Sequence, residues 1–299
     1  MLNNILILIP KKLVRYIDFF VDNFIKKLND NNYITIVIHN NCKIEKHVNV
    51  QDLSHICIFQ SLVEFKEILK YLIYESNFKG DVKLISTECT TCTKNKDIIR
   101  GNVKFIKEVY KKVKINIYDY SGENLINYKN DYRLSNNILK LLEPNYHYID
   151  LPKDKNIEIG TYIRFCNDEF KNKYMIKLKR KLKNMTGLWR DDRLEFVKRC
   201  KLFINVHANE DFKICETHRI YELIAARCIV ISQRCQNEKI VTLSDYIIFV
   251  EDIDIVDTSL HILQNYNKFY ERIYGNKTNK EIFKDINIQW DNFIKPFTE

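Results

Sequence analysis

The sequence Cys215-Glu-Thr-His-Arg-Ile-Tyr-Glu-Leu-Ile-Ala-Ala-Arg-Cys-Ile-Val-Ile-Ser232 places a polar helix start directly ahead of an apolar strand. Apolar residues at helical spacing predict a helix over residues 217–226. The run 228–232 has the length and composition of a strand buried on both faces. Strand-like runs alternate with helical patterns throughout the chain, so the sequence predicts an α/β fold with parallel sheets.

The strand-like runs fall into two groups on either side of a proline-bearing segment. They are 5–9, 33–39, 56–60, 82–86 and 115–118 in the first group, and 157–163, 202–206, 228–232 and 246–250 in the second. Residues 143–152 hold two of the four prolines and are the best candidate for a hinge. We therefore expect two doubly wound, Rossmann-like domains, residues 1–147 and 148–299, that face each other across a cleft, with the last helix able to pack back on the first domain. In such sheets ligands bind at the carboxyl ends of the strands.

The composition excludes several classes of protein. The 299 residues carry a net charge of +9, and the apolar fraction of 45% is that of an ordinary globular protein. The six glycines are scattered, which excludes the glycine-rich phosphate loops of dinucleotide-binding domains, P-loop ATPases and protein kinases. The nine cysteines lie mostly in apolar runs and indicate reduced thiols inside a cell, and the single C-x-x-C, Cys89 to Cys92, lacks the further ligands of a zinc site. With no secretory signal and no apolar run of membrane-spanning length, we expect a soluble cytoplasmic protein.

The positive charge is concentrated in residues 171–201, which include twelve Lys and Arg residues and three acids. One interpretation is a nucleic-acid-binding groove, because lysine arrays displace counterions from phosphates. The other is the solvated face of an amphipathic helix, whose opposite face carries apolar residues at helical spacing. These are Met175, Leu178, Leu182 and Met185. No aromatic side chain lies between Tyr174 and Trp189, so a base-stacking platform is missing and the solvated helix face is favoured.

The helix start at residues 216–222 has the groups that bind an anion. Main-chain N–H groups without helical partners and the positive end of the helix dipole favour a diphosphate there, and Arg219 adds a fork of N–H donors. The carboxylate of Glu222 can accept hydrogen bonds from two neighbouring hydroxyls of a ribose. The alternative is a solvated cap, with Thr217 as the N-cap and Arg219 paired with Glu222 at the surface. The pattern alone leaves both interpretations open.

Three segments of the second half together resemble the carboxy-terminal domain of GT-B glycosyltransferases, most closely the group-1, spore-coat-protein-like branch. They are Leu202–His207, Glu216–Glu222 and Ile229–Ser232. The resemblance implies that Glu222 holds the ribose of a nucleotide and that Glu216 faces the donor sugar, although five residues separate these glutamates where seven are usual. It also matches Glu158-Ile-Gly160-Thr161 to the family's first loop after the hinge, with Arg164 as a phosphate ligand.

The resemblance implies a glycosyltransferase of the hexosyltransferase type. Such an enzyme moves a sugar from a nucleotide-diphosphate donor to an acceptor, here unidentified, with no metal or other cofactor, and the family likeness favours retention of configuration. The donor would lie mainly on residues beyond the hinge, and the acceptor on the first half. The candidate catalytic residues are Glu216 and His207. The candidate donor-binding residues are Gly160, Thr161, Arg164, Arg190, Thr217, His218, Arg219 and Glu222, with Arg193 as a further phosphate contact.

Several other acidic and basic groups are weaker candidates. Asp252-Ile-Asp254 has the D-x-D form of a metal site, but it follows the last strand, and acidic triplets are common in loops. An inverting reaction needs a base from the first half, for which Glu88, His39 and Asp119 are candidates. Two other classes stay open, namely a nucleic-acid-binding protein that uses residues 171–201 and an inactive fold that binds nucleotide sugars. Nucleic acid is the less favoured partner.

Overall fold

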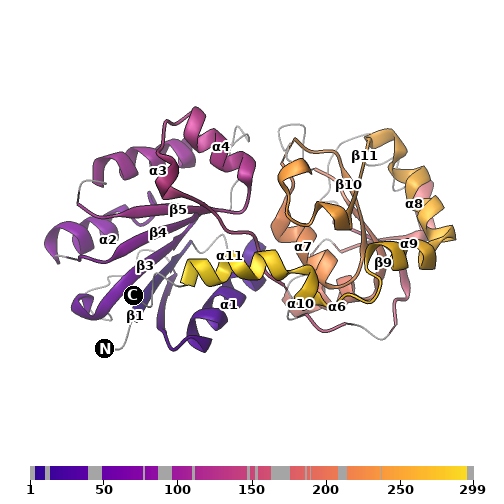
Figure 1. Ribbon diagram of the computed structural model, residues 1–299, viewed down its shortest axis with the longest axis horizontal. Coiled ribbons are helices and arrows are strands. Elements are labelled where there is room, and N and C mark those ends of the chain that lie inside the picture. Colours follow the sequence, from indigo (N-terminus) through magenta and orange to yellow (C-terminus); the bar gives the residue numbers. More distant parts are fainter. Residues whose placement is uncertain are drawn as a thin grey trace. The chain divides into compact units, whose positions relative to one another are not determined.

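The computed structural model divides into two compact units, each built around one parallel sheet (Figure 1). Unit 1 is Met1–Glu143 with Ile288–Glu299, and unit 2 is Pro144–Asn287. The structure describes residues 4–10, 14–39, 49–76, 78–86, 96–109, 112–146, 149–151, 154–162, 176–185, 187–188, 190–207, 214–236 and 238–294. Within these ranges, no helix combines the length and the apolar character that a membrane crossing requires.

Unit 1 contains a six-stranded parallel sheet with the order β2-β1-β3-β4-β5-β6. Its strands are β1 (Asn4–Ile9), β2 (Ile34–His39), β3 (Leu53–Phe59), β4 (Asp81–Ser86), β5 (Ile115–Asp119) and β6 (Leu139–Leu141). Its helices are α1 (Val14–Asp30), α2 (Lys66–Lys70), which continues as a π-helical turn Tyr71–Glu75, α3 (Lys96–Val109) and α4 (Gly122–Asn130). Residues 5–9 are fully buried, because an uninterrupted apolar run suits a central strand that helices cover on both faces.

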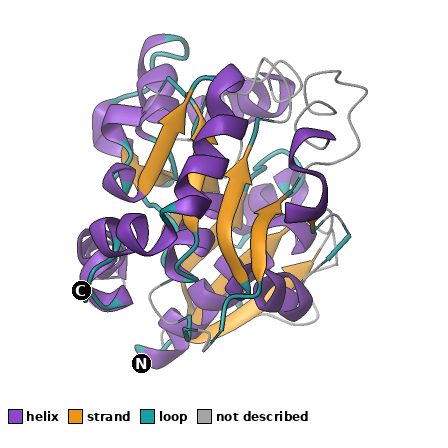
Figure 2. Cartoon of the chain, turned by 90° about the vertical axis from the view of Figure 1, so that its right-hand side faces the viewer, coloured by secondary structure: helices purple, strands orange, loops and turns teal. Residues whose placement is uncertain are grey.

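Unit 2 contains a five-stranded parallel sheet with the order β11-β10-β9-β7-β8, and Figure 2 shows its strands with helices beside them. Its strands are β7 (Ile157–Thr161), β8 (Leu182–Asn184), β9 (Cys200–Asn205), β10 (Ile229–Gln233) and β11 (Ile247–Val250). Its helices are α6 (Arg190–Lys198), α7 (Thr217–Ala225), α8 (Ile255–Gln264), α9 (Tyr266–Ile273) and α10 (Asn279–Ile282), followed by α11 (Lys284–Ile294). The structure thus confirms the α/β fold with two parallel sheets, and all nine predicted strands are present.

The helix predicted across residues 175–185 is confirmed only at residues 176–178, and the residues after them are not α-helical. Lys179–Lys181 is a 3-10 turn, and Leu182–Asn184 is the edge strand β8, which pairs with β7. Leu178 and Leu182 are nevertheless buried, because a turn followed by a short strand returns side chains to the core at intervals close to those of a helix. Met175 lies outside the described residues.

Helix α11 has residues in both units. In unit 1, the rings of Trp290 and Phe293 lie 5.9 and 5.5 Å from that of Phe24, and Trp290 Nε1 donates to the carbonyl of Glu143 at 2.8 Å. The buried ammonium of Lys83 donates to the carbonyl of Phe293 at 3.3 Å. A cation therefore closes the carboxyl end of this helix, where the helix dipole is negative.

Candidate active site

The strand order of unit 2 reverses beside β7. Strand β8 pairs with one edge of β7 and β9 pairs with the other. In open α/β sheets, ligands bind outside the carboxyl ends of the strands at such a point. Helix α7 follows β9 and precedes its parallel neighbour β10, so the first turn of α7 belongs to the same edge. The candidate site is therefore this carboxyl edge; residues 163–175, which include Arg164, and residues 208–213 lie outside the described part of the chain.

The first turn of α7 carries an accessible ion pair. Glu216 is the N-cap residue but makes no side-chain capping hydrogen bond; its carboxylate instead lies 2.8 Å from Nη1 of Arg219. The Arg219 guanidinium also lies over the ring of Tyr162, 5.0 Å from its centroid, directly beyond the end of β7. The Arg219 side chain is 26% exposed, so a ligand can reach it, whereas the Glu216 oxygen that faces it is buried. The expected N-cap, Thr217, is instead the first helical residue and is buried.

A second ion pair on α7 is buried. Arg193 of α6 donates from Nε and Nη2 to the two carboxylate oxygens of Glu222, at 3.3 and 2.8 Å. The Glu222 side chain is 2% exposed and that of Arg193 12%, so the pair ties α6 to α7 inside unit 2. The alternative of a surface pair between Arg219 and Glu222 is therefore wrong, because Glu222 is buried against Arg193 of α6 and Arg219 pairs with Glu216.

Gly160 and Thr161 hold β7 against β9. A side chain on Gly160 would meet Cys200 Sγ at 2.6 Å and the ring of Phe203 at 2.7 Å, so the glycine is required for close packing within the sheet. The hydroxyl of Thr161 is fully buried and donates to the carbonyl of Ile204 at 3.1 Å. Both residues thus position the end of β7 from which Tyr162 projects.

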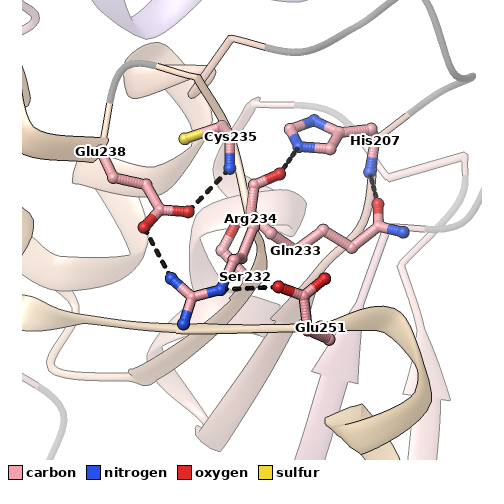
Figure 3. A network of polar contacts seen from close by, with 7 residues as sticks. All are labelled: His207, Ser232, Gln233, Arg234, Cys235, Glu238 and Glu251. Atoms are coloured by element: carbon pink, nitrogen blue, oxygen red, sulfur yellow. Dashed lines mark hydrogen bonds and ion pairs between the residues drawn. The ribbon is translucent and has the colours of Figure 1, made fainter.

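A polar network joins the carboxyl ends of β9 and β10 (Figure 3). The main-chain N–H of His207 donates to the side-chain oxygen of Gln233, and the His207 Nε2 lies 3.1 Å from the carbonyl of Arg234. Because a carbonyl can only accept, Nε2 bears a proton and the neutral ring has its lone pair on Nδ1. Burial lowers the pKa of His207, while the hydrogen bond to Arg234 opposes that shift. The Arg234 guanidinium is held at 2.9 Å by both Glu238 and Glu251.

Three residues of this edge were not predicted from the sequence as candidate site residues, namely Tyr162, Gln233 and Arg234. Each directly follows or ends an apolar strand, at the carboxyl end of β7 or β10. That position is the signal that could have found them. His218 belongs to the same first turn of α7, and its carbonyl accepts from the buried hydroxyl of Tyr146 at 3.0 Å.

The remaining acidic candidates have structural partners. Asp252 lies in a 3-10 turn after β11 and accepts from the side-chain amide of Gln233. In the part of the chain that the structure describes, no group of three or more His, Cys, Asp or Glu residues could hold a metal ion. Asp119, at the end of β5, accepts from the N–H of Ser121 and from Asn124 Nδ2, both at 2.9 Å, and so holds the start of α4. Outside the described residues lie Glu88, Cys89, Cys92 and the side chains of His39 and Arg190.

The described residues of the basic stretch 171–201 form helical turns at 176–181, strand β8, helix α6 and the start of β9, so the interpretation of the stretch as one solvated helix face is wrong in that form. Lys181 lies 2.9 Å from Glu158, and Lys198 lies 3.0 Å from Glu195. Lys177, Arg180 and Lys183 are exposed. The stretch therefore mixes paired cations with exposed ones.

Two viral proteins of unknown function are similar to the chain in sequence, whereas no family model matches it. Uncharacterized protein R358 of Acanthamoeba polyphaga mimivirus is 29% identical over 174 residues, which are 54% of this chain and 58% of that protein. Uncharacterized protein L140 of the same virus is 25% identical over 272 residues, 87% of this chain and 80% of its own length. The chain thus spans little more than half the length of the first of these relatives.

Solved structures match the chain over nearly its whole length. An alpha-glucosyltransferase in complex with UDP and a 13-mer DNA containing an HMU base has a TM-score of 0.64 at 11% identity, with 100% of both chains covered. A glycosyltransferase from Rickettsia africae has a TM-score of 0.61 at 8% identity and covers 99% of this chain and 98% of its own. T4 phage BGT in complex with UDP and Mn²⁺ has a TM-score of 0.56 at 10% identity, with 98% and 99% covered. Together with the two parallel sheets, these likenesses show that the chain has the GT-B fold, the fold of these glycosyltransferases.

Proposed function

We propose that the protein is a glycosyltransferase that takes a hexose from a uridine-diphosphate donor. The observation that carries the proposal is the Arg219 guanidinium, which lies accessible at the first turn of α7, at the point where the strand order of unit 2 reverses. A guanidinium and a helix start together supply the positive charge that a departing diphosphate requires. Two structural neighbours that match the chain over nearly its whole length are in complex with UDP, which supports uridine as the nucleoside of the donor.

The other residues of the edge take roles around the diphosphate. Glu216, paired with Arg219, faces the donor sugar, and the neutral ring of His207 is the second candidate for contact with the reacting groups. Contact of Glu222 with the ribose belongs to the same proposal and requires the carboxylate to part from Arg193, because both oxygens are bonded to that guanidinium and the side chain is 2% exposed. Retention of configuration and catalysis without a metal belong to the same proposal, as does a location in the cytoplasm.

The acceptor is a separate question, and a specific observation favours including DNA among its candidates. One structural neighbour is an alpha-glucosyltransferase in complex with DNA that contains an HMU base, and this chain carries a net charge of +9. Exposed cations such as Lys177 and Lys183 could contact a phosphate backbone. An acceptor panel should therefore contain hydroxymethylated duplex DNA beside oligosaccharides.

The proposal is tested first by nucleotide binding and then by turnover. UDP at one hundred times its Kd would raise the free energy of unfolding by about 2.7 kcal/mol, whereas GDP and ADP at the same concentration should have a smaller effect. UDP-glucose and UDP-N-acetylglucosamine are then assayed for release of UDP, with Arg219→Gln as the variant expected to lose it. Absence of stabilisation by any nucleotide would contradict the proposal. Binding without hydrolysis or transfer would indicate an inactive nucleotide-sugar-binding fold, and salt-dependent DNA binding alone a nucleic-acid-binding protein.

A further inference from the structure

The Arg219 side chain is held from two sides by residues of different elements. Glu216, at the start of α7, lies 2.8 Å from Nη1, and the ring of Tyr162 lies under the guanidinium with its centroid 5.0 Å away. Tyr162 follows Thr161, whose buried hydroxyl is bonded to the main chain of β9. The ring therefore directly follows an interior strand of the sheet, and a buried hydrogen bond holds the end of that strand to β9.

The two contacts use the guanidinium differently. The carboxylate lies against Nη1 as an ion pair, whereas an aromatic ring attracts the face of the guanidinium and consumes none of its five N–H donors. The ring on one side and the carboxylate on the other restrict the orientations of the guanidinium, so the N–H groups that face away from both point in a narrower range of directions. Such a group can bind an oxyanion through two parallel hydrogen bonds without first losing rotational freedom.

We propose that Tyr162 is a positioning residue, whose ring orients the Arg219 guanidinium toward the β-phosphate of a nucleoside diphosphate. The inference rests on the proposed function, because it takes the donor diphosphate as the ligand of Arg219. It assigns to Tyr162 a role in recognition of the diphosphate and none in recognition of the nucleoside. The phenol hydroxyl has no part in it, since only the face of the ring is used.

The test separates the phosphates from the nucleoside. Dissociation constants of UDP, UMP and uridine are measured calorimetrically for the full chain and for variants at position 162. Tyr162→Phe keeps the ring face and should bind all three ligands within about twofold of the wild type. Tyr162→Leu and Tyr162→Met remove the ring; each should weaken UDP binding roughly fivefold and leave uridine binding unchanged. Two such variants are used so that one remains informative if the other fails to fold.

A further variant changes Arg219, the residue that the ring of Tyr162 contacts. Arg219→Gln should weaken UDP binding more than either change at position 162, and in its background Tyr162→Phe and Tyr162→Leu should bind UDP equally. An unchanged ratio of UDP to uridine affinity in both ring-less variants would overturn the positioning role. One form of that result is an equal loss of affinity for UDP, UMP and uridine, which would indicate damage to the whole carboxyl edge of the sheet. If the wild type bound none of the ligands, the proposed function itself would be wrong.

Discussion

The buried ion pair between Arg193 and Glu222 leads to the sharpest prediction on stability. Arg193→Met leaves the carboxylate of Glu222, 2% exposed, without its bidentate partner, and Glu222→Leu leaves the guanidinium, 12% exposed, without its carboxylate. Removal of one member of a buried pair costs about 3–5 kcal/mol, because the other charge stays desolvated and uncompensated. About 1 kcal/mol corresponds to roughly 2–4 °C in a unit of this size, so each single variant should melt roughly 6–20 °C lower.

The double variant distinguishes charge from packing. Arg193→Met with Glu222→Leu replaces the pair by apolar side chains, a change that is often neutral or stabilising, so its stability should return close to that of the wild type. The assay is urea denaturation of the four proteins, which gives the coupling energy of the pair. Lys181→Met is the matched control, since Lys181 and Glu158 are both 45% exposed and such a pair contributes at most about 1 kcal/mol. Additive losses in the double variant, or single losses no larger than that of the control, would refute the reasoning.

Two further lysines allow predictions of a different kind. Lys155 donates to the carbonyls of Lys198, Cys200 and Ala226 at 3.2, 2.7 and 2.8 Å. Lys155→Met should therefore lower the free energy of unfolding, measured by urea denaturation, by about 3 kcal/mol. A loss below about 1 kcal/mol would contradict this role. Burial lowers the pKa of Lys83 from 10.5 to about 8, so its unfolded form binds more protons between these values. Stability relative to Lys83→Met should therefore rise from about pH 8 toward pH 10, by up to about 3 kcal/mol; a flat difference across that range would argue against a buried ammonium.

Strands were predictable from the sequence because a central parallel strand leaves a local signal. The run 5–9 is apolar at every position and the run 229–232 at every position but the last, and no helix with a solvated face has that composition. The region 175–185 has no such signal. Its buried residues recur at intervals that fit a helix as well as a turn and a strand, and the choice is made by the pairing of Leu182 with Ile159. That partner is more than twenty residues away, so no local pattern contains it.

The same limit applies to the charges on α7. The sequence shows that Glu216, Arg219 and Glu222 are neighbours at helical spacing, and Arg219 can reach either glutamate. Which of the two it meets depends on the face that α6 covers. Arg193 pairs with the buried carboxylate of Glu222. Arg219 pairs with Glu216 at the carboxyl edge of the sheet. The location of the candidate site was therefore predictable, whereas the division into a buried pair and an accessible pair was not.

Because glycine is scarce in this chain, side chains and not a glycine-rich main chain must bind a phosphate at the carboxyl edge of the unit 2 sheet. Gly160 is the glycine at the end of β7, and the space that its missing side chain leaves is filled by Cys200 and Phe203. The main chain there is locked in the sheet and cannot wrap around a phosphate, as a glycine-rich loop does. Charge for a diphosphate must then come from an oriented side chain beside a helix start. A flexible arginine alone would lose much of its freedom on binding, and the ring of Tyr162 removes that cost in advance.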